Sequence, residues 1–173
     1  GYVSLAFAEN FLEILESMTL FFSTTVADDE EKKAIRRRSI AVIDENFETF
    51  VKTSIPNLFS NNEKDILEGK IELAKNIAKS TNKEGVKAAQ LGMAERPDRT
   101  EILENLDAKI LIIAGKYDNA VKTENLLKII PEKTNIKTYV LDCGHNGHWE
   151  KPTICAEIIN TELLHNLPKH FLL

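Results

Sequence analysis

The chain has 173 residues, 43% of them apolar, and a formal net charge of −5 at pH 7, which is enough for one sizeable core with or without an insertion. The negative charge argues against a nucleic-acid partner, and no apolar run approaches the ~18 residues of a membrane span, so no membrane partner is expected. Residues 1–8 lack the basic lead and cleavage site of a signal peptide, and two cysteines without redox-motif spacing fit a reducing, cytoplasmic location.

The first part of the chain predicts one helix and one strand. Residues 1–9 form a helical segment rich in small residues, and residues 16–22 form a mostly apolar strand. We expect this strand to be buried on both faces. The chain carries no initiator Met and opens inside the apolar, helix-like run.

The second part, about residues 28–95, contains no convincing strand and predicts helices only. Residues 28–38 place acids before bases, an order that complements the dipole of a helix beginning there. Residues 47–59 predict short helices broken at a proline, residues 61–79 an amphipathic helix, and residues 83–94 a fourth helix. The apolar side of the amphipathic helix is expected to consist of Ile66, Leu67, Ile71, Ala74 and Ala78.

From residue 98 onwards, helices and strands alternate again. The expected order is helix 100–105, strand 109–114, helix 121–130, strand 136–141 and helix 151–165. Strands therefore flank a helical insert of roughly 70 residues, which predicts an α/β fold of about three parallel strands. The expected units are the start of the core at 1–25, an all-helical unit at 26–97 and the C-terminal core at 98–173.

Two polar side chains follow the last two expected strands. Asp118 lies in the loop after strand 109–114, and His145 lies in a glycine-flexed loop after strand 136–141. A helical crossover joins these strands, so we expect them to be parallel and adjacent, with both loops at the same edge of the sheet. A carboxylate–imidazole hydrogen bond there would fix the imidazole tautomer and stabilise the imidazolium. The alternative is that both residues are ordinary loop residues.

A metal site is a weaker interpretation of the same loop. Cys143, His145 and His148 lie close together in sequence, but a zinc site needs three or four ligands and no partner segment is evident. No metal is therefore expected. Both cysteines are interpreted as buried thiols, and Glu150 as an acid that complements the start of the last helix.

These loops resemble the C-terminal part of the α/β-hydrolase superfamily. Residues 112–121, Ile-Ile-Ala-Gly-Lys-Tyr-Asp-Asn-Ala-Val, resemble the acid loop after the penultimate strand, and residues 143–152, Cys-Gly-His-Asn-Gly-His-Trp-Glu-Lys-Pro, resemble the histidine loop after the last strand. In that motif a glycine precedes the catalytic histidine, and an acidic residue and a proline follow it. His145, Glu150 and Pro152 match without a gap. The resemblance also explains the helical unit, because many members carry a helical cap over the substrate pocket.

The first residues resemble another part of the same superfamily. Residues 1–9 are similar to the helix that begins right after the nucleophile elbow, G-x-S-x-G, and Gly1 matches one of the glycines that end the elbow. The resemblance places the nucleophile just upstream of Gly1, together with both oxyanion-hole donors and the early strands. Ser4 is not expected to replace it, because Ser4 lies inside the helix without a strained turn.

The resemblance implies a serine-dependent hydrolase of small ester or acyl substrates. In the complete enzyme Asp118 would orient His145, and His145 would deprotonate the serine; no cofactor is implied, and this chain alone is expected to be inactive. Ser23, His148 and Trp149 are candidates for the substrate pocket. An aspartate nucleophile would instead give an epoxide hydrolase or dehalogenase, and a non-catalytic ligand-binding or interaction module is a further alternative.

Strand 16–22 also predicts a protein partner. An unpaired, flat, apolar edge is prone to association. We therefore expect this edge to pair with the N-terminal half of the same enzyme or with another copy of the chain.

Overall fold

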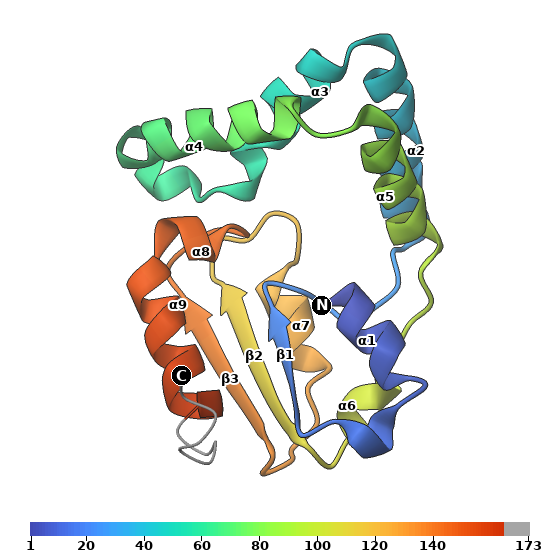
Figure 1. The fold of residues 1–173 in the computed structure, drawn as a ribbon, viewed down its shortest axis with the longest axis vertical. Coiled ribbons are helices and arrows are strands. Elements are labelled where there is room, and N and C mark those ends of the chain that lie inside the picture. The colour runs from blue at the N-terminus through green and yellow to red at the C-terminus, as the bar shows by residue number, and fades with distance from the viewer. Residues whose placement is uncertain (165–173) are drawn as a thin grey trace.

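Three parallel strands form a single sheet in a computed structural model that describes residues 1–164. Their order is β1-β2-β3, with β1 at Ser17–Phe21, β2 at Lys109–Gly115 and β3 at Ile136–Leu141. The predicted α/β class and the parallel pairing of β2 with β3 are confirmed. All three strands end at the edge that faces the helical part of the molecule (Figure 1).

Helices cover both faces of this sheet. Successive side chains of a strand point to opposite faces, and the central strand β2 carries apolar side chains on both. On one face, α1 (Tyr2–Ala8), α6 (Glu101–Asn105) and α7 (Thr123–Lys128) pack against the strands. The opposite face carries α9 (Pro152–Ile159). The strand side chains of the first face include Met18, Leu20, Ile110 and Ile112, and those of the second include Leu111 and Ile113.

The expectation that β1 is buried on both faces is wrong in part. Met18 and Leu20 are buried, whereas Thr19 and Phe21 are only half-buried and Ser17 is exposed. The reason is the position of α9, which lies beside β3 at the far side of the sheet from β1 (Figure 1). The second face of β1 is therefore only partly covered by a helix, and its side chains remain partly exposed to solvent.

The helical part follows β1 and precedes α6. It contains α2 (Glu30–Glu45), α3 (Phe47–Ser54), α4 (Lys64–Lys79) and α5 (Lys83–Glu95), with 3₁₀ turns at Pro56–Leu58 and Asn61–Glu63 between α3 and α4. Asp29 caps the start of α2 by accepting the Lys32 N–H at 2.7 Å.

One residue of the apolar side predicted for α4 lies elsewhere. Ile66 is 81% exposed, whereas Leu67 and Ile71 are buried against Phe59. Residues four apart share a helix face, but neighbours in sequence diverge by about 100°. The buried face therefore follows the spacing of Leu67, Ile71 and Ala74, and Ile66 falls beside it.

Two neighbouring connections join the helical part to the sheet layer. Arg99 donates its backbone N–H to the Thr25 carbonyl oxygen at 3.0 Å, and the hydroxyls of Thr25 and Thr100 lie 3.0 Å apart. Asp28, whose side chain is 1% exposed, forms ion pairs with Arg36 and Arg96. The two segments that connect the helical part to the sheet layer are thus bonded to each other.

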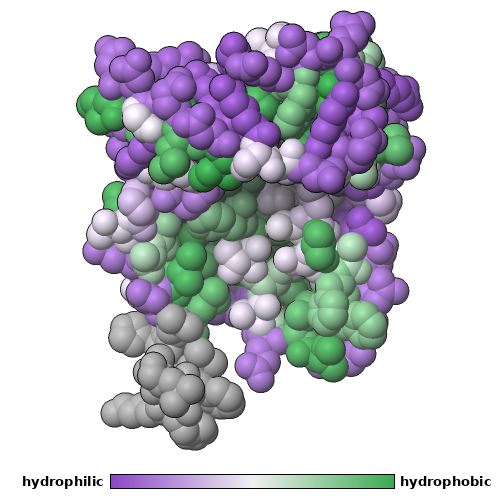
Figure 2. Space-filling model, turned by 45° about the horizontal axis from the view of Figure 1, so that its top comes forward, coloured by the Kyte–Doolittle hydropathy of each residue, from purple (hydrophilic) through white to green (hydrophobic). Residues whose placement is uncertain are grey.

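Between the helical layer and the sheet layer the surface is hollowed (Figure 2). Polar side chains cover the outer side of the helical part, while apolar side chains gather on the sheet layer near α1. No helix within residues 1–164 combines the length and the apolar character needed to cross a membrane.

The last predicted helix begins at Pro152 in the structure and continues as helix through residue 164. A short helix α8 at Gly147–Glu150 precedes α9, and a π-helical turn at Asn160–Leu164 follows it. The predicted end of this helix at residue 165 lies outside the described residues.

Candidate active site

Asp118 lies in the loop after β2 with its carboxylate fixed by the loop itself. Its side chain is 1% exposed. Oδ1 accepts the backbone N–H groups of Ala120 at 2.7 Å and of Val121 at 2.8 Å. The loop is closed by the Thr123 hydroxyl, which donates to the Gly115 carbonyl oxygen at 2.6 Å. These bonds occupy one carboxylate oxygen and leave Oδ2 for another partner.

That partner is His145, in the loop after β3. Its Nδ1 lies 2.8 Å from Asp118 Oδ2, and its side chain is 27% exposed. Within residues 1–164 no hydrogen bond is formed by Nε2 of His145. A neutral imidazole that donates Nδ1–H to a carboxylate keeps its lone pair on Nε2. The arrangement can therefore take up a proton at Nε2 while Asp118 stabilises the resulting charge.

Backbone contacts hold the acid loop against the histidine loop. Lys116 donates its N–H to the Leu141 carbonyl oxygen at 2.8 Å, and Tyr117 donates to the Cys143 carbonyl oxygen at 3.0 Å. The structure thus brings Asp118 and His145 together through neighbouring strand ends.

The turn after β1 reaches the same edge. Phe22 adopts a left-handed φ of 46° there, and its ring fills the space beside Gly147, where a β-carbon would lie 1.9 Å from Phe22 Cζ. Ser23 follows and is packed against the start of α1, because a β-carbon on Gly1 would lie 1.9 Å from Ser23 Oγ. The start of α1, the turn after β1 and the histidine loop therefore meet in one region.

The three residues predicted for a substrate pocket lie around this region without forming one described cavity. Ser23 is buried, and His148 is exposed, with its ring centroid 6.1 Å from that of Phe21. Desolvation and the nearby charge of His145 lower the pKa of His148. Trp149 is half-buried and packs against the apolar cluster of the helical part. Their contact with substrate stays a prediction.

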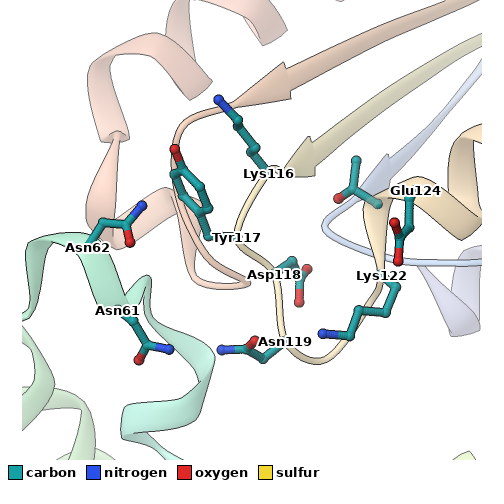
Figure 3. Close-up of a pocket in the computed structure, with 9 residues that line it drawn as sticks. Asn61, Asn62, Lys116, Tyr117, Asp118, Asn119, Lys122 and Glu124 are labelled. Carbon is teal, nitrogen blue, oxygen red and sulfur yellow. The ribbon is translucent and has the colours of Figure 1, made fainter.

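A polar cavity of about 340 Å³ lies beside the acid loop (Figure 3). The helical part contributes Asn61 and Asn62, and the acid loop contributes Tyr117, Asp118 and Asn119 among others. Neither His145 nor any of the three predicted pocket residues lines it. The cavity therefore lies next to Asp118 but does not include His145 in its lining.

Glu150 makes contacts that were not predicted from the sequence. It ends α8, and its carboxylate accepts the backbone N–H groups of Gly144 at 2.9 Å and Ser60 at 3.3 Å. Glu150 therefore joins the histidine loop to the helical part, and its interaction with the start of the last helix stays a prediction. Burial raises the pKa of the Glu150 carboxyl. Its spacing from His145 and its position before the last helix single out Glu150 in the sequence, but neither indicates a contact with Ser60.

Neither cysteine offers metal or nucleophile chemistry. Cys143 is fully buried, and burial with the neighbouring Glu150 charge raises the pKa of its thiol to about 12. Burial likewise raises the pKa of Cys155. Among residues 1–164 no group of three His, Cys, Asp or Glu side chains is arranged to hold a metal ion.

Several solved structures resemble this chain. A thermophilic esterase from Thermogutta terrifontis is 30% identical and superposes with a TM-score of 0.83 over 95% of this chain and 61% of its own. The enol-lactonase from Burkholderia xenovorans LB400 is 15% identical, with a TM-score of 0.80 over 92% of this chain and 60% of its own. MenH from S. aureus is 19% identical, with a TM-score of 0.78 over 94% of this chain and 64% of its own.

The chain thus spans about three fifths of the length of these proteins. No family model and no curated protein sequence matches it.

Proposed function

Because this chain belongs to the α/β-hydrolase superfamily and has the fold of its C-terminal portion, we propose that it supplies the acid, the base and the helical cap of an esterase-like hydrolase. The observation that carries the proposal is the 2.8 Å contact between Asp118 Oδ2 and His145 Nδ1. The loop amides bind the other carboxylate oxygen, so the imidazole is oriented with Nε2 available as a base.

In the proposed reaction, a serine upstream of Gly1 attacks the carbonyl carbon of an ester. His145 Nε2 takes the serine hydroxyl proton and passes it to the leaving alcohol, which leaves an acyl-enzyme. Water then attacks the acyl group, giving its proton to His145, and that proton returns to the serine as the acid is released. Asp118 keeps the imidazole in one tautomer and stabilises its charged form throughout.

We propose small ester or related acyl compounds as substrates. Two of the structural relatives are described as an esterase and an enol-lactonase, and both names refer to cleavage of an acyl–oxygen bond. We assign the cap role to residues 26–97, because their helices stand over the edge at which β2 and β3 end (Figure 1), and Asp118 and His145 lie in the loops that follow these strands. A cap over this edge would limit the size of the acyl group and separate the site from bulk solvent.

Ester hydrolysis by the longer protein that includes the segment before Gly1 tests this proposal. We expect it to cleave p-nitrophenyl acetate, and we expect His145→Ala to lower kcat/KM by about 10³-fold or more. His148→Ala removes a neighbouring exposed imidazole that is a candidate for the substrate pocket, so we expect it to change KM more than kcat. An organophosphate that labels a serine would support the acyl-enzyme route, whereas unchanged activity of His145→Ala would exclude His145 as the base.

We also propose a partner for the free edge of β1. This strand pairs only with β2 within the described residues, and an apolar groove of about 350 Å³ runs along it. Val3 is 84% exposed and Phe7 44% exposed beside the groove. Such an edge is a template for another strand, which we assign to the N-terminal part of the same enzyme.

A further inference from the structure

The Glu150 carboxylate joins two segments that are far apart in sequence. Its Oε1 accepts the Gly144 N–H at 2.9 Å, and both carboxylate oxygens lie 3.3 Å from the Ser60 backbone nitrogen. Gly144 directly precedes His145. One side chain therefore binds the backbone next to the proposed base and the backbone of the helical part.

The backbone at residues 58–60 also contacts the histidine loop directly. Asn146, on the other side of His145, donates its N–H to the Leu58 carbonyl oxygen at 3.0 Å. A β-carbon on Gly144 would lie only 2.6 Å from the Ser60 nitrogen. His145 is thus held between two attachments to the same short segment.

The stability of the fold alone does not explain why the Glu150 carboxylate is buried. Glu150 is 7% exposed, and no basic side chain within residues 1–164 bonds to it; the adjacent Lys151 pairs with Glu63 instead. Burying a carboxylate without a cation is costly, and two backbone N–H groups compensate only in part. What the arrangement provides is a fixed geometry between segment 58–60 and the residue before His145.

We propose that Glu150 is a positioning residue that couples segment 58–60 of the cap to the base His145. The proposal rests on the proposed function, in which His145 takes the proton of the nucleophile. A displacement of segment 58–60 moves the Gly144 amide through the shared carboxylate, and with it the imidazole relative to Asp118. The position of the cap thereby sets how well the base is aligned for proton transfer.

The backbone at Ser60 allows a direct test of this coupling. Ser60 has φ −60° and ψ 136°, and Phe59 has φ −104° and ψ 155°. These angles suit a proline and the residue before a proline. Ser60→Pro therefore removes the N–H that Glu150 accepts, and it also removes the hydroxyl that accepts the Asn62 N–H. Ser60→Ala removes the hydroxyl alone and is the matched control.

In the complete enzyme, we expect Ser60→Pro and Glu150→Met, which removes both acceptor oxygens, each to lower kcat about tenfold with a smaller change in KM, because a small misplacement of a catalytic group affects the chemical step most. We also expect both to shift the pH at which kcat/KM rises, whereas Ser60→Ala keeps the wild-type values. If Ser60→Pro and Ser60→Ala share the wild-type kcat and pH profile, the coupling is excluded.

A second measurement on this chain separates the coupling from the hydrolase proposal. Ser60→Pro should increase amide hydrogen exchange at Gly144 and alter the His145 ring resonances, while Ser60→Ala leaves both unchanged. Thermal unfolding of each variant shows whether it is folded, and the comparison of Ser60→Pro with Ser60→Ala tests the coupling if Glu150→Met does not fold. Unchanged Gly144 exchange in folded Ser60→Pro overturns the coupling. Absence of ester hydrolysis by the wild-type enzyme overturns the function instead.

Discussion

Gly115 lies so close to Gly144 that a β-carbon on Gly115 would stand 2.2 Å from the Gly144 carbonyl oxygen. We therefore expect Gly115→Ala to push the histidine loop away from the acid loop and to destabilise the chain by about 1–3 kcal/mol, the usual cost of overpacking. Gly92→Ala is the control, because nothing lies within 4 Å of the added carbon and alanine favours a helix. Thermal unfolding that ranks Gly115→Ala as the more stable variant would contradict the close contact.

Asp118→Asn should abolish the ability of His145 to act as a base while keeping the geometry of the acid loop. The amides of Ala120 and Val121 require an oxygen at the Oδ1 position, so the asparagine would direct its NH₂ group at His145 Nδ1. The imidazole must then carry its proton on Nε2, where it cannot accept another. We expect kcat of the complete enzyme to fall by about 10⁴-fold, as this tautomer change does in a related triad.

The control for that variant is Asp142→Asn, since the Asp142 side chain is 73% exposed in a surface ion pair with Lys116. It should leave kcat close to the wild-type value. Nitrogen-15 shifts of the His145 ring report the tautomer directly. A ring that keeps its proton on Nδ1 in Asp118→Asn would refute the explanation.

The connections between cap and sheet depend on Asp28. Burial opposes ionisation of Asp28, but its hydrogen bonds to Arg36 and Arg96 outweigh burial and hold the pKa of its carboxyl below the usual value. Asp28→Asn should destabilise the chain by about 3–5 kcal/mol, because it leaves the largely buried Arg96 without its counter-charge. Urea unfolding measures this, with Glu30→Gln as the control at an exposed ion pair. Equal stabilities of the two variants would count against the role of Asp28.

Glu162 should make the chain sensitive to acid. Its hydrogen bonds with Lys109, Tyr139 and Lys137 lower the pKa of its carboxyl from 4.5 to about 2. A depressed carboxyl pKa adds stability above the unfolded-state value and loses it as the pH falls through the folded-state value. The difference in melting temperature between the wild type and Glu162→Gln should therefore be full at pH 6 and shrink between pH 4.5 and pH 2. A difference that is constant over this range would show that the charge of Glu162 does not matter.

The acid–base pair could be predicted from the sequence because its position depends only on the order of neighbouring strands and helices along the chain. A strand, a crossover helix and a second strand bring the following loops to one edge whatever the details of packing. For this reason Asp118 and His145 could be expected to lie close to each other. The spacing of apolar residues likewise predicts the order of helices and strands.

Contacts that depend on distant segments could not be placed in the same way. Glu150 binds an amide 90 residues away in sequence, and no pattern near either residue indicates the other. The second face of β1 is incompletely covered because α9 lies elsewhere, which a single apolar run cannot reveal. The position of Ile66 likewise depended on which neighbours α4 meets, not only on its own periodicity.

The free edge of β1 predicts the behaviour of this chain in isolation. With apolar side chains beside the groove and no strand on the outer side of β1 within the described residues, we expect the chain to self-associate or to be poorly soluble. Thr19→Lys places a charge in the groove and should reduce this association, because edge lysines oppose strand pairing. Thr49→Lys adds the same charge at an exposed position on α3.

Light scattering during size-exclusion chromatography distinguishes the two variants. If Thr19→Lys shifts the chain toward monomer and Thr49→Lys does not, association occurs through the edge of β1 and not through a general effect of charge. The same Thr19→Lys change in the complete enzyme should lower stability, since the groove would there be filled by the N-terminal part. A monodisperse wild-type monomer with this edge exposed would contradict the proposed partner.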